Sequence, residues 1–247
     1  ARFPAIRDQL PMRAARVREF LQVSGLGPGD LDVIVARGGL LPPVRHGAYA
    51  VTEHLVRTLL DRPAEEHASN LGAGIAWEIS KEDGIPALIY DSVSVDELLP
   101  VARLSGVRGY DRRSFSHVLN MRAVARALAD KEGFVLEEVN VITVHLGGGI
   151  SLSVQSGGRF IDVFSADEGP YSTERSGGLP VYTAAAIARE EGAEGLYSYA
   201  VGRGGLFSYT GSTDAMAIEQ KALSGDADMR LLYEGIAYQT AKAVGSL

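Results

Sequence analysis

A run of three glycines beside a histidine is the feature of this sequence best suited to chemistry. The segment lies between two β-rich runs and reads His145-Leu-Gly-Gly-Gly-Ile-Ser151. Because glycine has no side chain, the backbone can turn tightly there and bring bare N–H groups against phosphate oxygens. No helix follows and no Lys-Ser or Lys-Thr pair closes the run, which disfavours Rossmann and P-loop readings. The sequence therefore predicts a phosphate-handling loop, with a plain hairpin turn as the alternative.

Three further turns join an arginine to a pair of glycines. They are Arg37-Gly-Gly, Arg175-Ser-Gly-Gly and Arg203-Gly-Gly. A guanidinium beside exposed backbone N–H groups suits bidentate recognition of carboxylate or phosphoryl oxygens. The recurrence favours an anionic substrate, and because the chain contains 29 glycines, chance recurrence is the alternative.

An aspartate and a histidine elsewhere in the chain are further candidates. Asp91 ends a predicted strand, and in an α/β sheet the crevice beyond the strand ends is the usual ligand site. A carboxylate there could hold Mg²⁺ or orient a substrate, although strand-end aspartates more often form caps or turns. His117 follows two arginines and could stabilise transition-state charge, whereas an isolated histidine is usually structural. No two histidines have zinc-ligand spacing on one helix face.

The elements expected to position these residues alternate in the first part of the chain. The apolar pattern predicts a helix ending near Val23, a strand over 31–36, helices over 53–60 and 69–83, and a strand over 86–90. Alternating strands and helices predict an α/β layer fold with mostly parallel strand pairing.

After Asp91 the pattern becomes helical and then β-rich. Helices are predicted over 95–102 and 121–133, followed by an antiparallel meander of strands over 139–144, 150–154 and 159–163. Helix returns over 183–191 and from residue 226 onward, with a glycine loop at 202–205. A domain boundary near Val93 is predicted, which gives a first domain over 1–93 and a second over 94–247.

Composition excludes several classes of function. The 247 residues are 46% apolar and 22% charged with a net charge of −7, so the chain is an ordinary globular protein and nucleic acid is not an expected partner. The absence of cysteine excludes disulfides, thiol catalysis and thiolate metal sites. No apolar run approaches the roughly 20 residues that span a bilayer, and the start lacks a signal-peptide core. We expect a cytoplasmic protein without membrane contact.

Taken in order, these segments resemble butyrate kinase, a member of the acetate kinase group in the superfamily of sugar kinases, Hsp70 and actin. The resemblance covers nearly the whole chain and is carried by Val35-Ala-Arg-Gly-Gly-Leu-Leu41, His67-Ala-Ser-Asn-Leu-Gly72, Ile89-Tyr-Asp-Ser-Val93, Ser116-His-Val-Leu-Asn120, Val144-His-Leu-Gly-Gly-Gly-Ile-Ser151, Glu168-Gly-Pro-Tyr-Ser-Thr-Glu-Arg-Ser-Gly-Gly-Leu-Pro180 and Gly202-Arg-Gly-Gly-Leu206. Acetate kinases tend to have Asn at the position of Gly148 and Asp at that of Gly178. These two positions favour the butyrate branch.

The resemblance implies that ATP and a short carboxylate, with Mg²⁺, give an acyl phosphate and ADP. It implies two ribonuclease-H-like domains of the actin-like ATPase type with the reaction in the cleft between them. It assigns His145 and Gly147 to Gly149 to a phosphate loop that binds ATP. It assigns catalysis to Asp91, His117, Arg175 and, less directly, Arg37, the metal contact to Asp91, and a place in the cleft to Asn70.

The resemblance also has gaps. The opening serine-rich phosphate loop and the late Gly-Gly adenosine motif of the family do not occur in this sequence, so we expect two incomplete domains and activity only in a longer protein. A dimer, or an assembly of dimers, is the expected oligomer. Two alternatives stay open, an acetate or propionate kinase and a non-catalytic binding protein that keeps the fold. Joint retention of Arg37, Asp91, His117, His145 and Arg175 argues against the second.

Overall fold

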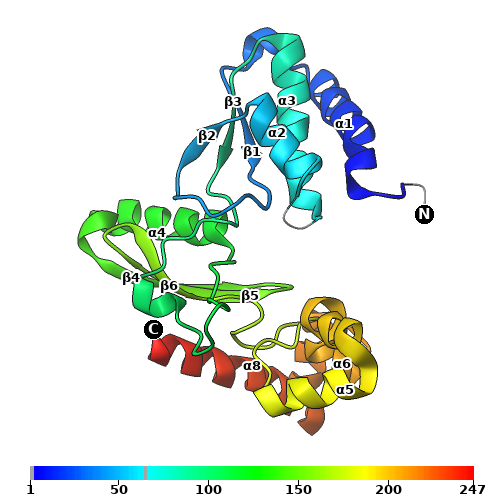
Figure 1. The fold of residues 1–247 in the computed structure, drawn as a ribbon, viewed down its shortest axis with the longest axis vertical. Coiled ribbons are helices and arrows are strands. Elements are labelled where there is room, and N and C mark those ends of the chain that lie inside the picture. The colour runs from blue at the N-terminus through cyan, green and yellow to red at the C-terminus, as the bar shows by residue number, and fades with distance from the viewer. Residues whose placement is uncertain (1–2, 64–65) are drawn as a thin grey trace. The chain divides into compact units, whose positions relative to one another are not determined.

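The computed structural model describes residues 3–63 and 66–247 and divides into two compact units, the first ending at Asp96 and the second starting at Glu97. Figure 1 shows a small sheet in each unit, with helices packed against it. The two units are described separately below.

The sheet of the first unit has three short strands. They are β1 (Ile34–Arg37), β2 (Ala48–Ala50) and β3 (Ala87–Tyr90), with β3 in the centre, parallel to β1 and antiparallel to β2. The central position of β3 agrees with its apolar side chains, because Ala87 and Ile89 are buried in the core of this unit. The sheet edge where β1 and β3 end therefore presents the residues that follow each strand.

Helices α2 (Glu53–Leu60) and α3 (Leu71–Asp83) pack against this sheet, and α1 (Leu10–Val23) packs against α3. The N-terminus of α2 is fixed by Thr52, whose hydroxyl accepts a hydrogen bond from the Leu55 N–H. Gly84 ends α3 in the left-handed conformation, at φ 71°, which a glycine adopts at low cost. These caps place both helix boundaries where the sequence predicted them.

The second unit begins with an antiparallel meander. Strands β4 (Asn140–Leu146), β5 (Ile150–Ser156) and β6 (Arg159–Phe164) pair in chain order, as predicted, and a bulge lies at Val154/Gln155. The tight β5–β6 turn is possible because Gly157 and Gly158 both have positive φ, 56° and 72°.

Helices cover both faces of this meander. Helix α4 (Val118–Glu132) lies on one face and α8 (Ala227–Ser246) on the other, as Figure 1 shows. Alternation along the strands explains this, because Ile150 and Leu152 of β5 pack against Ala243 of α8, whereas Ser151 points to α4. Strand β5 is thus buried on both faces.

The remaining helices complete the second unit. Helix α5 (Val181–Ser198) extends the predicted helix and contains a kink at Gly192, followed by α6 (Gly205–Thr210) and α7 (Ala215–Leu223). Single helical turns of other types occur at η1 (Ile6–Gln9), η2 (Pro28–Asp30), η3 (Ala68–Asn70), η4 (Pro100–Arg103), η5 (Leu136–Glu138) and η6 (Tyr199–Arg203).

Three predictions about the elements are wrong. The segment 202–205 is not a loop, because η6 extends to Arg203 and α6 begins at Gly205. Parallel pairing does not dominate, because β1–β3 is the one parallel strand pair in the part of the chain described. No α-helix forms over 95–102, where only η4 is helical. The side chains of Val95 and Leu98 are buried, and Val95 forms an isolated β-bridge with Val44. Pro100 has no N–H with which to continue a helix. Among the described helices, none has the length and apolar character to cross a membrane.

Candidate functional site

The three glycines form the tip of the β4–β5 hairpin. Strand β4 ends at Leu146 and β5 begins at Ile150, so Gly147 to Gly149 are the whole connection. The register pairs His145 with Ser151 across the two strands. The predicted loop is therefore a hairpin turn in geometry, and the chemistry-bearing side chains flank its base on one face of the sheet.

Two histidines lie stacked beside this turn. The rings of His117 and His145 have centroids 3.8 Å apart and planes only 10° from parallel. His117 is the residue before α4, and His145 comes from β4, so the contact of α4 with the sheet brings them together. Neither residue was predicted to touch the other from the sequence.

Each ring is held at its Nδ1 atom by a neighbouring side chain. The Ser151 hydroxyl lies 2.8 Å from His117 Nδ1, and Asn120 Nδ2 lies 2.9 Å from His145 Nδ1. An amide nitrogen only donates, so His145 Nδ1 accepts and the proton of its neutral ring is on Nε2. That Nε2 faces the turn, since it lies 2.9 Å from where a Cβ on Gly147 would be.

Burial favours the neutral form of His145. Partial desolvation lowers the pKa of His145 below its ordinary value of 6.5. At neutral pH the ring is therefore uncharged and presents an N–H donor to the glycine turn. It can bind an anion by hydrogen bonding without carrying charge itself.

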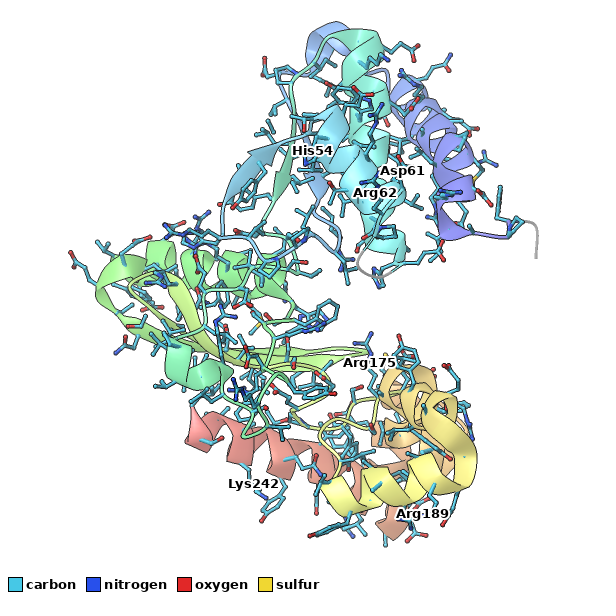
Figure 2. All side chains as sticks on the ribbon, viewed as in Figure 1. His54, Asp61, Arg62, Arg175, Arg189 and Lys242 are labelled. Atoms are coloured by element: carbon cyan, nitrogen blue, oxygen red, sulfur yellow. The ribbon has the colours of Figure 1, made fainter. Side chains whose placement is uncertain are left out.

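Arg175 approaches the same turn from another segment. A Cβ on Gly149 would lie 2.8 Å from Arg175 Nη1 and 3.4 Å from His117 Cε1, so glycine lets Arg175 approach the turn as closely as it does. The Nε atom of Arg175 is buried and, among the residues described, has no hydrogen-bond partner. Figure 2 shows Arg175 where the second unit's sheet meets its helical part. The guanidinium atom nearest the turn is Nη1, so an anion at the turn would meet Arg175 there.

The three glycines are not equivalent. A Cβ on Gly147 would meet the His145 ring and one on Gly149 would meet Arg175, but one on Gly148 would have only Glu174 Oε1 in ordinary contact at 3.7 Å. Gly148 is also exposed. Larger residues therefore fit at the middle position, whereas a side chain at either outer position would force His145 or Arg175 to shift.

The segment that carries Arg175 is tied to the turn by hydrogen bonds. The Ser172 hydroxyl donates to the Gly148 carbonyl at 2.6 Å, and the Ser172 N–H donates to the Arg175 carbonyl at 3.0 Å. Gly205 approaches closely as well, because a Cβ there would lie 2.1 Å from the Ser172 carbonyl oxygen. The glycines after Arg203 therefore serve packing of the Arg175 segment.

The third arginine–glycine turn does not contribute to this cluster. The guanidinium of Arg203 forms an ion pair with Glu191 at 3.4 Å and lies over the Tyr199 ring at 4.7 Å. Its side chain is thus engaged within the helical part of the second unit. The recurrence of arginine–glycine turns favoured an anionic substrate, and that prediction stays untested for Arg203, whose neighbours here are a carboxylate and an aromatic face.

Asp91 belongs to the first unit and is held in an unusual conformation. It is 2% exposed and has φ 40°, the only positive φ of a non-glycine residue in the described chain. Its Oδ1 accepts a hydrogen bond from the Gly47 N–H at 2.7 Å, and its own N–H donates to the Gly47 carbonyl at 3.1 Å. A strained, buried carboxylate just after a strand is typical of a functional position.

Asn70 and Arg37 also lie in the first unit. The Asn70 Oδ1 accepts a hydrogen bond from the Leu40 N–H at 2.8 Å and would be 2.5 Å from a Cβ on Gly39. Asn70 thus shapes the glycine turn after β1. Arg37, the last residue of β1, is exposed. Within 3–63 and 66–247, no cluster of three or more histidine, aspartate or glutamate side chains could hold a metal ion.

Sequence reasoning missed three residues of the cluster. Asn120 was missed because the helix was predicted to start at 121, whereas α4 begins at Val118 and includes Asn120 in its first turn. Ser151 was assigned only as the end of the loop, and Ser172 had no signal, because its contact with Gly148 depends on a fold between distant segments.

Comparison with solved structures finds the same fold in carboxylate kinases. Acetate kinase from Porphyromonas gingivalis superposes with a TM-score of 0.80 at 19% identity, covering 94% of this chain and 64% of that one. Acetate kinase from Entamoeba histolytica gives 0.78 at 17% identity, covering 96% and 64%. A propionate kinase from Francisella tularensis subsp. tularensis SCHU S4 gives 0.77 at 18% identity, covering 94% and 63%.

These likenesses establish the fold. The chain has the mixed α/β fold of the acetate kinases, as predicted, and spans slightly less than two thirds of their length. No protein-family model matches the sequence.

Proposed function

We propose that the protein to which this chain belongs is a carboxylate kinase. It transfers the γ-phosphoryl group of ATP reversibly to butyrate or a branched short-chain fatty acid, which gives an acyl phosphate and ADP. The observation that carries this proposal is the cluster of Arg175, the stacked pair His117–His145 and the bare turn Gly147–Gly149. The shared fold with acetate and propionate kinases supports the same reaction class.

The cluster suits phosphoryl transfer because that reaction needs positioning and charge stabilisation rather than covalent help. Arg175 offers a guanidinium with a buried, unsatisfied Nε, and His145 offers an uncharged N–H donor. His117 adjoins both the turn and Arg175 and is placed to stabilise charge on the phosphoryl oxygens. The glycines let those oxygens approach the backbone.

The carboxylate substrate needs no general base because it is ionised at neutral pH. Asp91 therefore has a different role in this proposal, the ordering of Mg²⁺ bound to ATP. A single carboxylate fits this role, since Mg²⁺ in kinases is held by one or two carboxylates together with substrate phosphates. Arg37 is proposed as a catalytic residue and Asn70 as a residue of the substrate cleft.

Gly148 and Gly178 carry the resemblance to the butyrate branch, and the packing around Gly178 supports glycine at that position. Gly178 lies so close to the Glu168 backbone that a Cβ would be 2.6 Å from the Glu168 carbonyl oxygen, so the aspartate typical of acetate kinases does not fit there. An acetate or propionate kinase is the second candidate, favoured by the activities of the structural neighbours.

The remaining parts of the proposal follow from the resemblance to butyrate kinase. We propose ribonuclease-H-like domains over 1–93 and 94–247, a cytoplasmic location and an assembly built from dimers. ATP and Mg²⁺ are the proposed cofactors.

The test is a substrate ranking. The protein is incubated with ATP, Mg²⁺ and each linear or branched acid from two to five carbons, and acyl phosphate is trapped as hydroxamate. We expect the highest kcat/KM with butyrate or a branched acid. A preference for acetate or propionate would select the second candidate, and no product with any acid would exclude a carboxylate kinase.

A further inference from the structure

Ser151 is a fully buried hydroxyl at the base of the glycine turn. It is 0% exposed and lies on the face of β5 that is covered by α4. Its Oγ is 2.8 Å from His117 Nδ1, 3.3 Å from the His117 backbone nitrogen and 3.5 Å from Met121 Sδ. All three contacts are with the N-terminal end of α4, so this one atom joins the turn to the helix that carries His117.

The hydrogen-bonding capacity of a hydroxyl matches these three contacts. A serine has one proton to donate and two lone pairs that accept. The His117 N–H uses one lone pair, which leaves the proton and the second lone pair. When Nδ1 is unprotonated the hydroxyl donates to it. When Nδ1 carries a proton the hydroxyl accepts from it and turns its own proton to the Met121 sulfur.

Ser151 can therefore keep its bond to His117 in either charge state. This matters because charge develops on the transferred phosphoryl group, and a cationic ring stabilises that charge more than a neutral one. A hydrogen bond that survives the change of charge keeps the His117 ring stacked on His145 and its Cε1 edge against Gly149 and Arg175.

We propose that Ser151 is a positioning residue for His117 in phosphoryl transfer. The proposal rests on the carboxylate kinase function proposed above. Ser151 touches neither the nucleotide nor the acid in this account and acts only through the orientation of His117.

The kinetic test compares Ser151→Ala with Ser153→Ala in the active protein. Ser153 is a matched control because it is also 0% exposed and lies on the same face of β5, but its hydroxyl contacts Thr143 Oγ1 at 2.9 Å and no site residue. We expect Ser151→Ala to lower kcat on the order of tenfold to a hundredfold, because a charge-assisted hydrogen bond is lost. KM for ATP and for the acid should stay within about twofold.

Equal kcat values for the two variants would overturn the proposal, because a shared loss reports only a missing buried hydroxyl. A rise in KM for ATP without a fall in kcat would also overturn it, since that pattern belongs to a binding residue.

A spectroscopic test is independent of activity. The chain has 5 histidines, so the ¹⁵N resonances of the imidazole nitrogens can be assigned one by one. We expect Ser151→Ala to shift the Nδ1 resonance of His117 and Ser153→Ala to leave it unchanged. An unshifted resonance would overturn the positioning role. If the wild-type protein phosphorylated no acid, the proposed function would fall while this measurement still decided the role of Ser151.

Discussion

Arg175 has a buried side-chain nitrogen without a hydrogen-bond partner among the described residues. This nitrogen is Nε, and a buried unsatisfied donor costs about 1–3 kcal/mol. A phosphoryl oxygen at the turn would benefit from the guanidinium charge through Nη1, the Arg175 atom nearest Gly149.

We expect Arg175→Ala to lower kcat roughly a thousandfold, by analogy with arginines that stabilise phosphoryl transfer. Arg175→Lys should recover only part of the rate, because an ammonium lacks the guanidinium fork. Steady-state kinetics with ATP and the preferred acid measure both effects. Arg203→Ala is the matched control, since its guanidinium pairs with Glu191. A similar loss at both positions would contradict the assignment of Arg175.

His145 makes the stability of the protein depend on pH. Burial lowers the pKa of His145, so the unfolded chain binds a proton more readily than the folded chain. The free energy of unfolding should therefore fall as pH drops below about 6.5, the pKa of an unfolded histidine, and should not change on this account above it.

The measurement is denaturant unfolding at intervals between pH 5 and 8. His145→Gln should flatten the acid side of the stability curve relative to wild type, whereas His54→Gln, at an exposed position of α2, should not. Parallel curves for wild type and His145→Gln would show that protonation of this ring is not linked to folding.

At the residue scale, the sequence singled out His117, His145 and Arg175 by side-chain type and context, but it did not predict the contacts between them. Their stacking and spacing depend on how α4 and the Arg175 segment fold onto the hairpin, which no local pattern encodes. Arg203 shows the converse, because its sequence context resembles that of Arg175 while its neighbours occupy it.

Among the elements, the β4–β5 hairpin controls the site through its turn. Gly149→Ala would place a Cβ 2.8 Å from Arg175 Nη1, so the guanidinium would have to move. We expect kcat/KM for ATP to fall on the order of a hundredfold, the scale of a 1 Å misplacement, with little change in melting temperature. Gly148→Ala, whose Cβ meets only ordinary contact, should lose much less. Equal losses would argue against the steric explanation.

The Arg112 side chain joins several elements of the second unit. It hydrogen-bonds Glu168 and Asp162 and the backbone carbonyls of Ala102 and Val163. The hydrogen bond with Glu168 raises the pKa of Arg112. Since Glu168 begins the segment that carries Arg175, this cluster anchors that segment to β6.

Arg112→Met should lower the free energy of unfolding by about 2–3 kcal/mol, less than a fully buried pair because 21% of the Arg112 side chain is exposed. Urea unfolding measures this loss. Arg16→Met, which removes an exposed pair with Glu19, should cost no more than about 0.5 kcal/mol. A comparable loss at both positions would show that the Arg112 cluster adds no more than a surface ion pair.

Local signals located the elements well where caps and alternation were present. The predicted helix ends agree with the caps, since Thr52 precedes α2, Gly84 follows α3 and Gly133 follows α4. The strict alternation of apolar and polar residues predicted the start of β5. The failure over 95–102 has a tertiary cause, because Val95 is buried and pairs with the distant Val44 instead of continuing a helix. Strand β2 is only three residues long and is recognisable mainly by its pairing with β3.

At the scale of the whole molecule, the edge strand of the second unit's sheet exposes apolar side chains. β4 is an edge strand within the described residues, and Ile142, Val144 and Leu146 on one of its faces are 40%, 37% and 64% exposed. Unpaired strand edges with apolar side chains favour pairing with another strand. We therefore expect the 247-residue chain, produced by itself, to self-associate.

Val144→Lys should reduce that association, since a charged side chain on an edge strand opposes further pairing. Size-exclusion chromatography with light scattering measures the change. Val124→Lys is the control, because Val124 is 55% exposed but lies on helix α4. Association that persists in Val144→Lys and disappears in Val124→Lys would place the contact on the helix instead.

The fit between Gly149 and Arg175 also constrains the paths along which relatives of this protein can diverge. A side chain at 149 would meet the Arg175 guanidinium, which would have to shift. A larger residue at 149 should therefore cost less activity in a relative that has a smaller residue at the position of Arg175. Because loss of Arg175 would itself remove the proposed activity, we expect active relatives to keep glycine and arginine together at these two positions.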